Sequence, residues 1–336
     1  MFARSALVDA VERVVSTTVT VVDPIRDGKN HSYRVAGVDG DEFFLKVGTR
    51  FPDAFPAEPA AVDLVRARTD VPLPTVRGTG RDPLGVPYAV FDYVPGVDAD
   101  GVASLPDRAA RRLCREAGEH LAAIHRIRFD AVGGLGVVDG AVAVTRERDY
   151  RTLLGASLER QVEDLRGSRF ADVCDRVAEA GAALVDDLDL SGVSPALVHG
   201  DYRLDNLRVD PTADRVTVAV VDWELPSTAD PLWDAVMALA LLTEGHDLSP
   251  TRRRTLRAAF RDGYEHDGSE TESAGAFPTD AADRLLAYEL LARARLMRHL
   301  DAELPEASER VRDARAREHR ALLDDLLDGH RRLTGE

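Results

Sequence analysis

The chain has 336 residues, of which 44% are hydrophobic and 30% charged, so it can bury a large core and form two lobes. Its formal net charge of −16 argues against binding to nucleic acid or to an anionic membrane. The longest strongly apolar run, Ala235 to Leu242, is too short to cross a bilayer. The N-terminus has acidic residues and no cleavable apolar segment, so we expect a cytoplasmic protein.

The basic residues are nearly all arginine, since Lys29 and Lys46 are the only lysines. A surface rich in carboxylates and poor in lysine favours a halophilic protein, because salt screens the repulsion between the carboxylates. A GC-rich coding sequence also favours arginine over lysine and would explain the composition without halophily. The two cysteines, Cys114 and Cys174, lie in helical patterns and predict reduced thiols, not a disulfide framework or metal site.

The first third of the chain is predicted to be rich in strands. We expect helices over 5–15 and about 56–68, and strands over 19–22, 33–35, 41–47, 75–78 and 88–93. Lys46 lies inside the apolar strand of Asp41 to Val47. It is either an edge-strand lysine whose ammonium reaches solvent or a cation with a functional reason for its position.

The rest of the chain is predicted to be mostly helical. We expect helices over 106–126, 147–166, 169–187, 231–244, 250–265, 279–301 and 305–332. A short strand, 196–198, and a hairpin that turns at 211–214 and continues as a strand over 216–221 interrupt these helices.

Three polar residues flank this hairpin. Asp201 follows the first strand, Asn206 comes five residues later, and Asp222 ends the last strand. Because a hairpin brings its two ends together, we expect the three side chains to converge. An aspartate, an asparagine five residues on, and an aspartate at a strand end form the pattern of kinase catalytic loops. Solvated turns would contain the same residue types, although not at these combined offsets.

The segments HGDYRLDN and VVDWE resemble those of the aminoglycoside phosphotransferase/choline kinase family. This resemblance implies an α+β, protein-kinase-like fold of two lobes, a nucleotide-binding lobe over 1–94 and a catalytic and acceptor-binding lobe over 95–336. It also implies an ATP- and Mg²⁺-dependent transfer of the γ-phosphoryl group to a hydroxyl of a small molecule, with GTP not excluded as the donor.

The resemblance implies roles in catalysis, metal binding or nucleotide binding for five residues. Asp201 would orient and deprotonate the acceptor hydroxyl, and Asn206 and Asp222 would bind Mg²⁺. Lys46 would hold the phosphates and pair with Glu58. Asp63 would replace Glu58 if the helix register differed.

Further residues would support the nucleotide or the catalytic loop. Arg203 would stabilise charge on the transferred group or be a surface arginine beside Asp205, and His199 would shape the loop more than transfer protons. The remaining expected nucleotide contacts are Asn30 and the hinge residues Asp92, Tyr93 and Val94, which would act through their backbone. His125 and Asp234 are expected to support the catalytic loop from below.

The longer run HGDYRLDN…VVDWEL also resembles the kinase-like domain found beside some acyl-CoA dehydrogenases, which acts on hydroxyacyl groups. The acceptor therefore stays open among hydroxyacyl compounds, sugars, amino alcohols and aminoglycosides, and the protein is expected to be a monomer or homodimer. A nucleotide-binding regulator without transferase activity is the alternative function. Only seven residues separate Asp222 from Asp230, which leaves no room for a protein-kinase activation segment.

Overall fold

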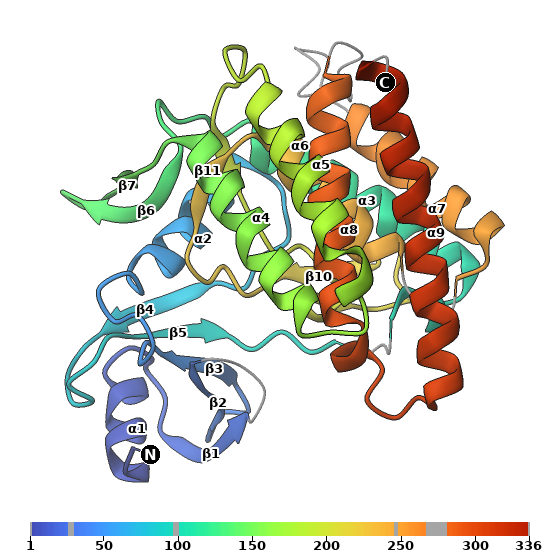
Figure 1. Cartoon of the computed structure of the whole chain (residues 1–336). Helices are drawn as coiled ribbons and strands as arrows, with labels where there is room; N and C mark the ends of the chain where they lie inside the picture. Colours follow the sequence, from blue (N-terminus) through green and yellow to red (C-terminus); the bar gives the residue numbers. More distant parts are fainter. Residues whose placement is uncertain (1, 26–29, 97–100, 245–247, 267–280, 335–336) are drawn as a thin grey trace.

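The structure, a computed structural model, has a strand-rich N-terminal part and a helical C-terminal part, as expected from the sequence (Figure 1). It describes residues 2–25, 30–96, 101–244, 248–266 and 281–334, with the side chains beyond residue 329 excepted. Gly28 and Lys29 of the first strand connection lie outside the described residues. No helix within these ranges is both long and apolar enough to span a bilayer.

The N-terminal part is a five-stranded antiparallel sheet in the order β1-β2-β3-β5-β4. Its strands are β1 (Val19–Ile25), β2 (His31–Gly37), β3 (Glu42–Val47), β4 (Val76–Gly80) and β5 (Tyr88–Asp92). The first helix, α1 (Arg4–Glu12), packs its apolar side on this sheet through Leu7 and Val11, which are buried with Leu45 of β3 in one cluster. Strand β3 is central, so Lys46 is not an edge-strand residue.

Helix α2 (Ala57–Arg68) connects the sheet to the rest of the molecule. Its apolar residues Val62 and Val65 belong to the same buried cluster as Leu121 and Ile124 of the C-terminal part. Because burial of apolar surface is the main favourable term in folding, this shared core fixes α2 against the helical part. The first turn of α2, which holds Glu58, is thereby placed between the two parts of the chain (Figure 1).

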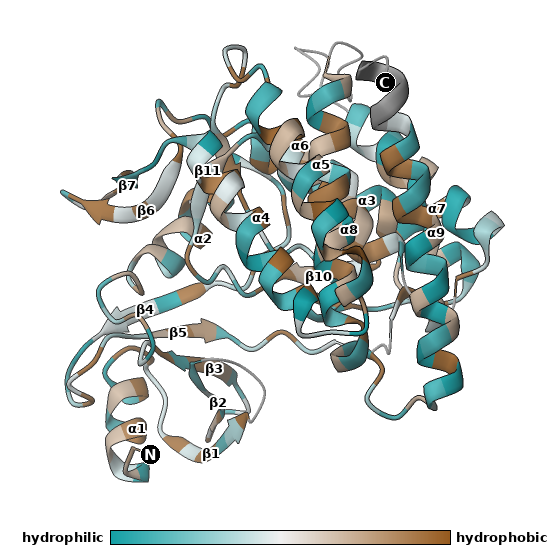
Figure 2. Cartoon of the chain, viewed as in Figure 1, coloured by the Kyte–Doolittle hydropathy of each residue, from teal (hydrophilic) through white to brown (hydrophobic). Residues whose placement is uncertain are grey.

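Long helices dominate the described residues of the C-terminal part, and Figure 2 shows apolar and polar segments alternating along them. They are α3 (Asp107–His125), α4 (Tyr150–Arg166), α5 (Cys174–Asp187), α6 (Pro231–Thr243), α7 (Pro250–Glu265), α8 (Ala282–Glu303) and α9 (Glu309–Thr334). The predicted ranges agree with these to within a few residues, except that α5 and α9 begin about four or five residues later than expected. Asp230 caps α6 by accepting from the Leu232 N–H at 3.0 Å.

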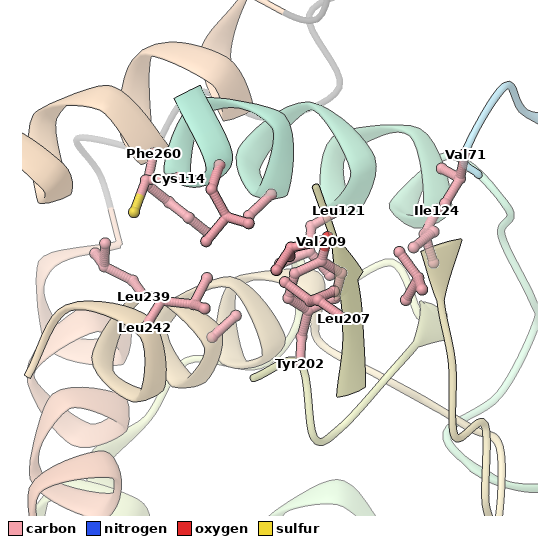
Figure 3. Close-up of a cluster of buried hydrophobic side chains, with 14 of the residues drawn as sticks. Val71, Cys114, Leu121, Ile124, Tyr202, Leu207, Val209, Leu239, Leu242 and Phe260 are labelled. Atoms are coloured by element: carbon pink, nitrogen blue, oxygen red, sulfur yellow. The ribbon is translucent and has the colours of Figure 1, made fainter. Parts of the chain in front are cut away.

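One core cluster lies between α3, α6, α7 and the short strands, as Figure 3 shows. Cys114 and Leu121 of α3, Tyr202 of the loop that follows β8 (Ala196–Val198), Leu207 of β9 (Leu207–Val209) and Leu239 of α6 lie in it. The loop is therefore anchored from below by packed side chains. Both cysteines are free and buried.

Two features of the short strands differ from the predictions. Strand β10 (Thr217–Val220) pairs with β9 (Leu207–Val209) as expected, but β8 (Ala196–Val198) belongs to another sheet, of order β7-β6-β11-β8. This sheet contains β11 (Ser227–Ala229) and a hairpin of β6 (Gly133–Val138) and β7 (Ala141–Glu147), none of which was predicted. The hairpin turns at Asp139 and Gly140, whose φ values of 50° and 79° are typical of a type I′ turn.

Candidate active site

Lys46 lies at the centre of the candidate site. It stands between two carboxylates, one from α2 and one from the segment that follows β10. Its Nζ donates to Glu58 Oε1 at 2.6 Å and to Asp222 Oδ1 at 2.8 Å. Lys46 and Glu58 are buried, whereas the Asp222 side chain is 44% exposed. The alternative partner Asp63 is exposed on the other side of α2. The ammonium therefore joins the strand-rich part to the end of the hairpin.

The electrostatics of this pair favour the charged lysine. Burial disfavours the Lys46 ammonium, but the charges of Glu58 and Asp222 outweigh it and hold the pKa of Lys46 well above its ordinary value. Burial raises the pKa of Glu58, while the lysine opposes this effect. The Lys46 ammonium is held in place, and its partner Asp222 is partly exposed. A cation in this position suits the binding of phosphate oxygens.

The β9–β10 hairpin brings Asn206 and Asp222 together. The Val221 N–H donates to the Asn206 carbonyl at 2.9 Å, which closes the ladder just before Asp222. Asp222 then has a φ of 62°, a conformation uncommon outside glycine and best tolerated by Asp and Asn. Strained residues of this kind cluster at functional sites, where the surrounding structure holds them in place.

Asp201 lies beside Asn206, as predicted, but the pairing of the strands that brings them together differs from the prediction. Its strand, β8, does not pair with the hairpin; the 3₁₀ turn of Leu204–Asn206 brings Asn206 back to it. Asn206 Nδ2 donates to the Asp201 carbonyl at 2.8 Å and lies 3.3 Å from its carboxylate Oδ2. The asparagine therefore links the backbone of the loop to the carboxylate that the loop presents.

The loop backbone is held from below by Asp234 of α6, as predicted. Its carboxylate accepts from the N–H groups of His199 and Gly200, each at 2.9 Å, and from His125 Nε2 at 3.1 Å. Because these donors outweigh the effect of burial, the pKa of Asp234 is lowered. Gly200 has a φ of 75°, which a residue with a side chain would adopt only with strain.

The His199 side chain supports the loop and does not face solvent. It is buried against Trp223, with ring centroids 4.8 Å apart, and Nε2 donates to the Val221 carbonyl at 3.2 Å. Burial lowers its pKa, although Asp234 opposes the shift, so the neutral imidazole is favoured. This environment suits the expected role in shaping the loop.

A second histidine holds the loop from α3. His120 Nδ1 lies 2.9 Å from the hydroxyl of Tyr202, and burial lowers the pKa of His120 to about 3. Burial also raises the pKa of Tyr202 well above its ordinary value. Both groups are therefore neutral at physiological pH and form a buried neutral contact beneath Asp201.

Two arginines flank the Asp201 carboxylate, and one of them was not predicted. Arg203 Nε lies 3.5 Å from Oδ2, and the same guanidinium lies 3.3 Å from Asp205. Arg295, which α8 contributes from nearly a hundred residues away, donates to Oδ1. Its sequence signal is weak, since arginines also occur at 293 and 298 of the same helix.

The expected nucleotide contacts lie on the N-terminal side. Asn30 Nδ2 donates to Glu224 Oε1 at 2.8 Å, so the first hairpin touches the segment after Asp222. The Asp92 N–H donates to Thr75 O and the Tyr93 N–H to Glu42 O, so both amides are used by the protein. Of the three hinge residues, Val94 is the one whose N–H makes no hydrogen bond to the residues that the structure describes.

The oxygen donors of the site fit a hard cation. Asn206 uses Nδ2 for Asp201, so its Oδ1 is the atom that would face a metal, and Asp222 offers a half-exposed carboxylate. Mg²⁺ is commonly bound through one or two protein oxygens together with substrate phosphates and water. Within the described ranges, no three or more His, Cys, Asp or Glu side chains are grouped so that they could hold a metal ion.

The model of the phosphotransferase enzyme family matches residues 21–276, well over half of the chain. The probable acyl-CoA dehydrogenase IBR3 of Arabidopsis thaliana is 28% identical over 176 residues, 49% of this chain and 20% of its own length. The chain spans about a fifth of the length of the curated relatives it matches.

Two solved structures share the fold over nearly the whole chain. A Ralstonia eutropha protein assigned to the aminoglycoside phosphotransferases has a TM-score of 0.66 and 17% identity, covering 99% of each chain. A mutant of aminoglycoside phosphotransferase APH(4)-Ia, in a ternary complex with AMP-PNP and hygromycin B, has a TM-score of 0.56 and 19% identity. It covers 92% of this chain and 94% of its own. This chain belongs to the phosphotransferase enzyme family.

Proposed function

We propose that the protein transfers the γ-phosphoryl group of ATP to a hydroxyl of a small molecule in the presence of Mg²⁺. The observation that carries the proposal is the placement of Lys46 between Glu58 and Asp222, at 2.6 and 2.8 Å, beside the loop that presents Asp201. The AMP-PNP and hygromycin B in the complex of the related structure support a nucleotide donor and a small acceptor.

In this proposal each residue has one task. Lys46 holds the phosphates, and the Val94 amide meets the adenine edge. Asp201 accepts the proton of the acceptor hydroxyl, whose oxygen attacks the γ-phosphorus while the bond to the β-phosphate oxygen breaks. Mg²⁺ held by Asn206 and Asp222 would neutralise charge on the phosphates.

Arg203 is proposed to stabilise charge on the transferred group. Its guanidinium lies between Asp201 and Asp205, and its Nε–H is buried without a hydrogen-bond acceptor among the described residues. Positioning and charge neutralisation supply most of the rate enhancement in phosphoryl transfer, so a donor held at this point suits the reaction.

The proposal separates Asp201 from Asp222, and two variants test it. Asp201→Asn cannot take the proton and should lower turnover by a factor of roughly 10² or more, with Mg·ATP affinity nearly unchanged. Asp222→Asn removes an anionic oxygen from the cation and should weaken both nucleotide binding and turnover. The measurements are ATP consumption against a library of hydroxylated metabolites in molar KCl and calorimetric titration of Mg·ATP.

The same measurements distinguish a phosphotransferase from the alternative function, a nucleotide-binding regulator. Mg·ATP binding by the wild type without phosphorylation of any acceptor would favour the regulator. If both variants bind nucleotide and turn over like the wild type, these residues are solvated turn groups and the proposed function is wrong.

A further inference from the structure

Two guanidinium groups converge on the one carboxylate that the proposed function assigns to the acceptor hydroxyl. Arg295 donates to Asp201 Oδ1 and also lies 3.5 Å from the Gly200 carbonyl, while Arg203 Nε lies 3.5 Å from Oδ2. The side chains are 23% exposed for Arg295, 43% for Arg203 and 39% for Asp201, so a small molecule can reach all three.

The neighbouring charges do not engage Arg295. Asp205 pairs with Arg203 and Asp164 pairs with Arg298, one turn further along α8. His299 follows Arg298 in α8. Burial lowers the pKa of His299, and the charge of Arg298 lowers it further, so this histidine adds no competing cation at neutral pH. Among the described residues, Asp201 is the carboxylate with which Arg295 forms an ion pair.

This arrangement places two cations beside the proposed base. An acceptor hydroxyl that reaches Asp201 lies beside both guanidinium groups, so a further group on the acceptor near that hydroxyl meets their N–H donors. An oxyanion on the acceptor would give the guanidinium a new partner of the same charge and geometry, because Arg binds carboxylate and phosphate through the same fork of N–H groups. An ammonium on the acceptor would instead meet two cations beside Asp201.

We infer that the acceptor is a hydroxylated oxyanion, a carboxylate or phosphate compound, and that Arg295 binds its anionic group as the hydroxyl takes its place at Asp201. The inference rests on the proposed function and narrows its acceptor class. It disfavours the polyamine acceptors of aminoglycoside type, because rejection of the wrong ligand by like charge is as effective as attraction of the right one.

The test uses acceptors that differ only in charge. One set is glucuronate, glucose and glucosamine, and the other is glycerate, glycerol and 2-aminopropane-1,3-diol. With wild-type protein, Mg·ATP and molar KCl, kcat/KM should be highest for the anion and lowest for the amine within each set. Phosphate-bearing and carboxylate-bearing acceptors are then compared through glycerol 3-phosphate and glycerate, which distinguishes the two kinds of oxyanion.

Arg295→Gln and Arg298→Gln form a matched pair of variants, since both residues are partly exposed arginines of α8 that bind a carboxylate. Arg295→Gln should raise KM for the anionic acceptors by roughly tenfold to a hundredfold, the effect of losing charge-assisted hydrogen bonds, and change KM for the neutral ones little. Arg298→Gln should leave both values near those of the wild type, and Arg295→Lys should restore part of the affinity. Melting temperatures check that all variants fold.

A binding measurement keeps the inference separate from the proposed function. Glycerate and inorganic phosphate are titrated calorimetrically into the Mg·ADP form of the wild type and of Arg295→Gln. Binding that depends on Arg295, without turnover of any acceptor, supports the oxyanion site and counts against the transferase. Turnover that favours neutral or amine acceptors, or that responds alike to both glutamine variants, overturns the oxyanion inference and leaves the transferase intact. Neither binding nor turnover overturns both.

Discussion

Asn30 and Glu224, which are 194 residues apart, form a hydrogen bond of 2.8 Å between the first hairpin and the segment that follows Asp222. Asn30 also accepts from the Arg50 N–H at 3.2 Å, so its amide is held at both ends. Asn30 directly precedes β2, and Glu224 lies two residues after Asp222, the proposed metal ligand. The hydrogen bond therefore joins the N-terminal sheet to the segment that holds Asp222. It therefore connects two parts of the chain that must close on the same nucleotide.

From this contact we expect Asn30→Ala and Glu224→Ala each to raise KM for ATP by roughly fivefold, since a hydrogen bond of this kind is worth about 1 kcal/mol. The double variant should be no worse than the worse single variant, because both lose the same bond. Steady-state kinetics at varied ATP measures this. Glu42→Ala, which breaks the exposed ion pair with Arg34 in the same sheet, is the control and should leave KM unchanged. Additive effects in the double variant would contradict the coupling.

A second prediction concerns the buried pair of Lys46 and Glu58. Lys46→Met leaves a buried carboxylate without its cation, which costs about 3–5 kcal/mol of unfolding free energy in comparable pairs. Adding Glu58→Gln removes the uncompensated charge and should recover most of that loss. Neither variant should be active, because both lack the ammonium. Urea unfolding and ATP consumption measure the two quantities, and a Lys46→Met variant as stable as the wild type would refute the account.

A third prediction concerns His120, whose pKa is lowered to about 3 by burial. The folded value lies below that of the unfolded chain, about 6.5, so the unfolded state binds the proton first. Its contribution to stability is therefore complete above about pH 6.5 and declines as the pH falls from there toward 3.

His120→Asn keeps an acceptor or donor near the Tyr202 hydroxyl but does not titrate, so its stability should fall less between pH 7 and 5 than that of the wild type. Urea midpoints at the two pH values measure the difference. His266→Asn, at the exposed histidine that directly follows α7, is the matched control and should leave the wild-type slope unchanged. Equal slopes for all three proteins would show that His120 is not the group responsible.

The parts of this site that the sequence could predict are local. Asp201, Asn206 and Asp222 lie within 22 residues of one another, and hairpin geometry alone brings the last two together. Glu58 is preferred to Asp63 because the family resemblance implies a carboxylate at that position as the partner of the lysine. Residue types, spacing and short-range geometry suffice for such relations.

The parts that could not be predicted depend on packing over long distances. Arg295 reaches Asp201 only because α8 packs beside α4, α5 and α6, and nothing local distinguishes it from Arg298. The hairpin turning at Asp139 and Gly140 is different, since Asp-Gly between alternating apolar residues is a strong local hairpin signal. That hairpin was predictable, whereas the position of Arg295 required the structure.

The last prediction concerns salt, which has two opposing effects on the stability of the folded protein. Arginine–carboxylate ion pairs connect helices at the surface. Arg169, for example, forms ion pairs with Asp301 of α8 and with Glu309 and Asp313 of α9. Salt weakens such pairs, but exposed pairs contribute little, typically about 0–1 kcal/mol each. Salt also screens the repulsion that follows from a net charge of −16. If the acidic, lysine-poor surface is an adaptation to high salt, the second effect is larger.

We therefore expect the melting temperature and the ATP-consuming activity to rise as KCl increases from about 0.1 M into the molar range, with most of the electrostatic gain below about 1 M, where the screening length falls to about 3 Å. Glycine betaine at equal osmolality is the control, because it is excluded from the protein surface like a stabilising salt but screens no charge. A rise in KCl that betaine fails to reproduce supports charge screening as the cause. A melting temperature that stays flat or falls would mean that ion pairs such as those of Arg169 outweigh the repulsion, and the composition would then reflect codon usage instead of halophily.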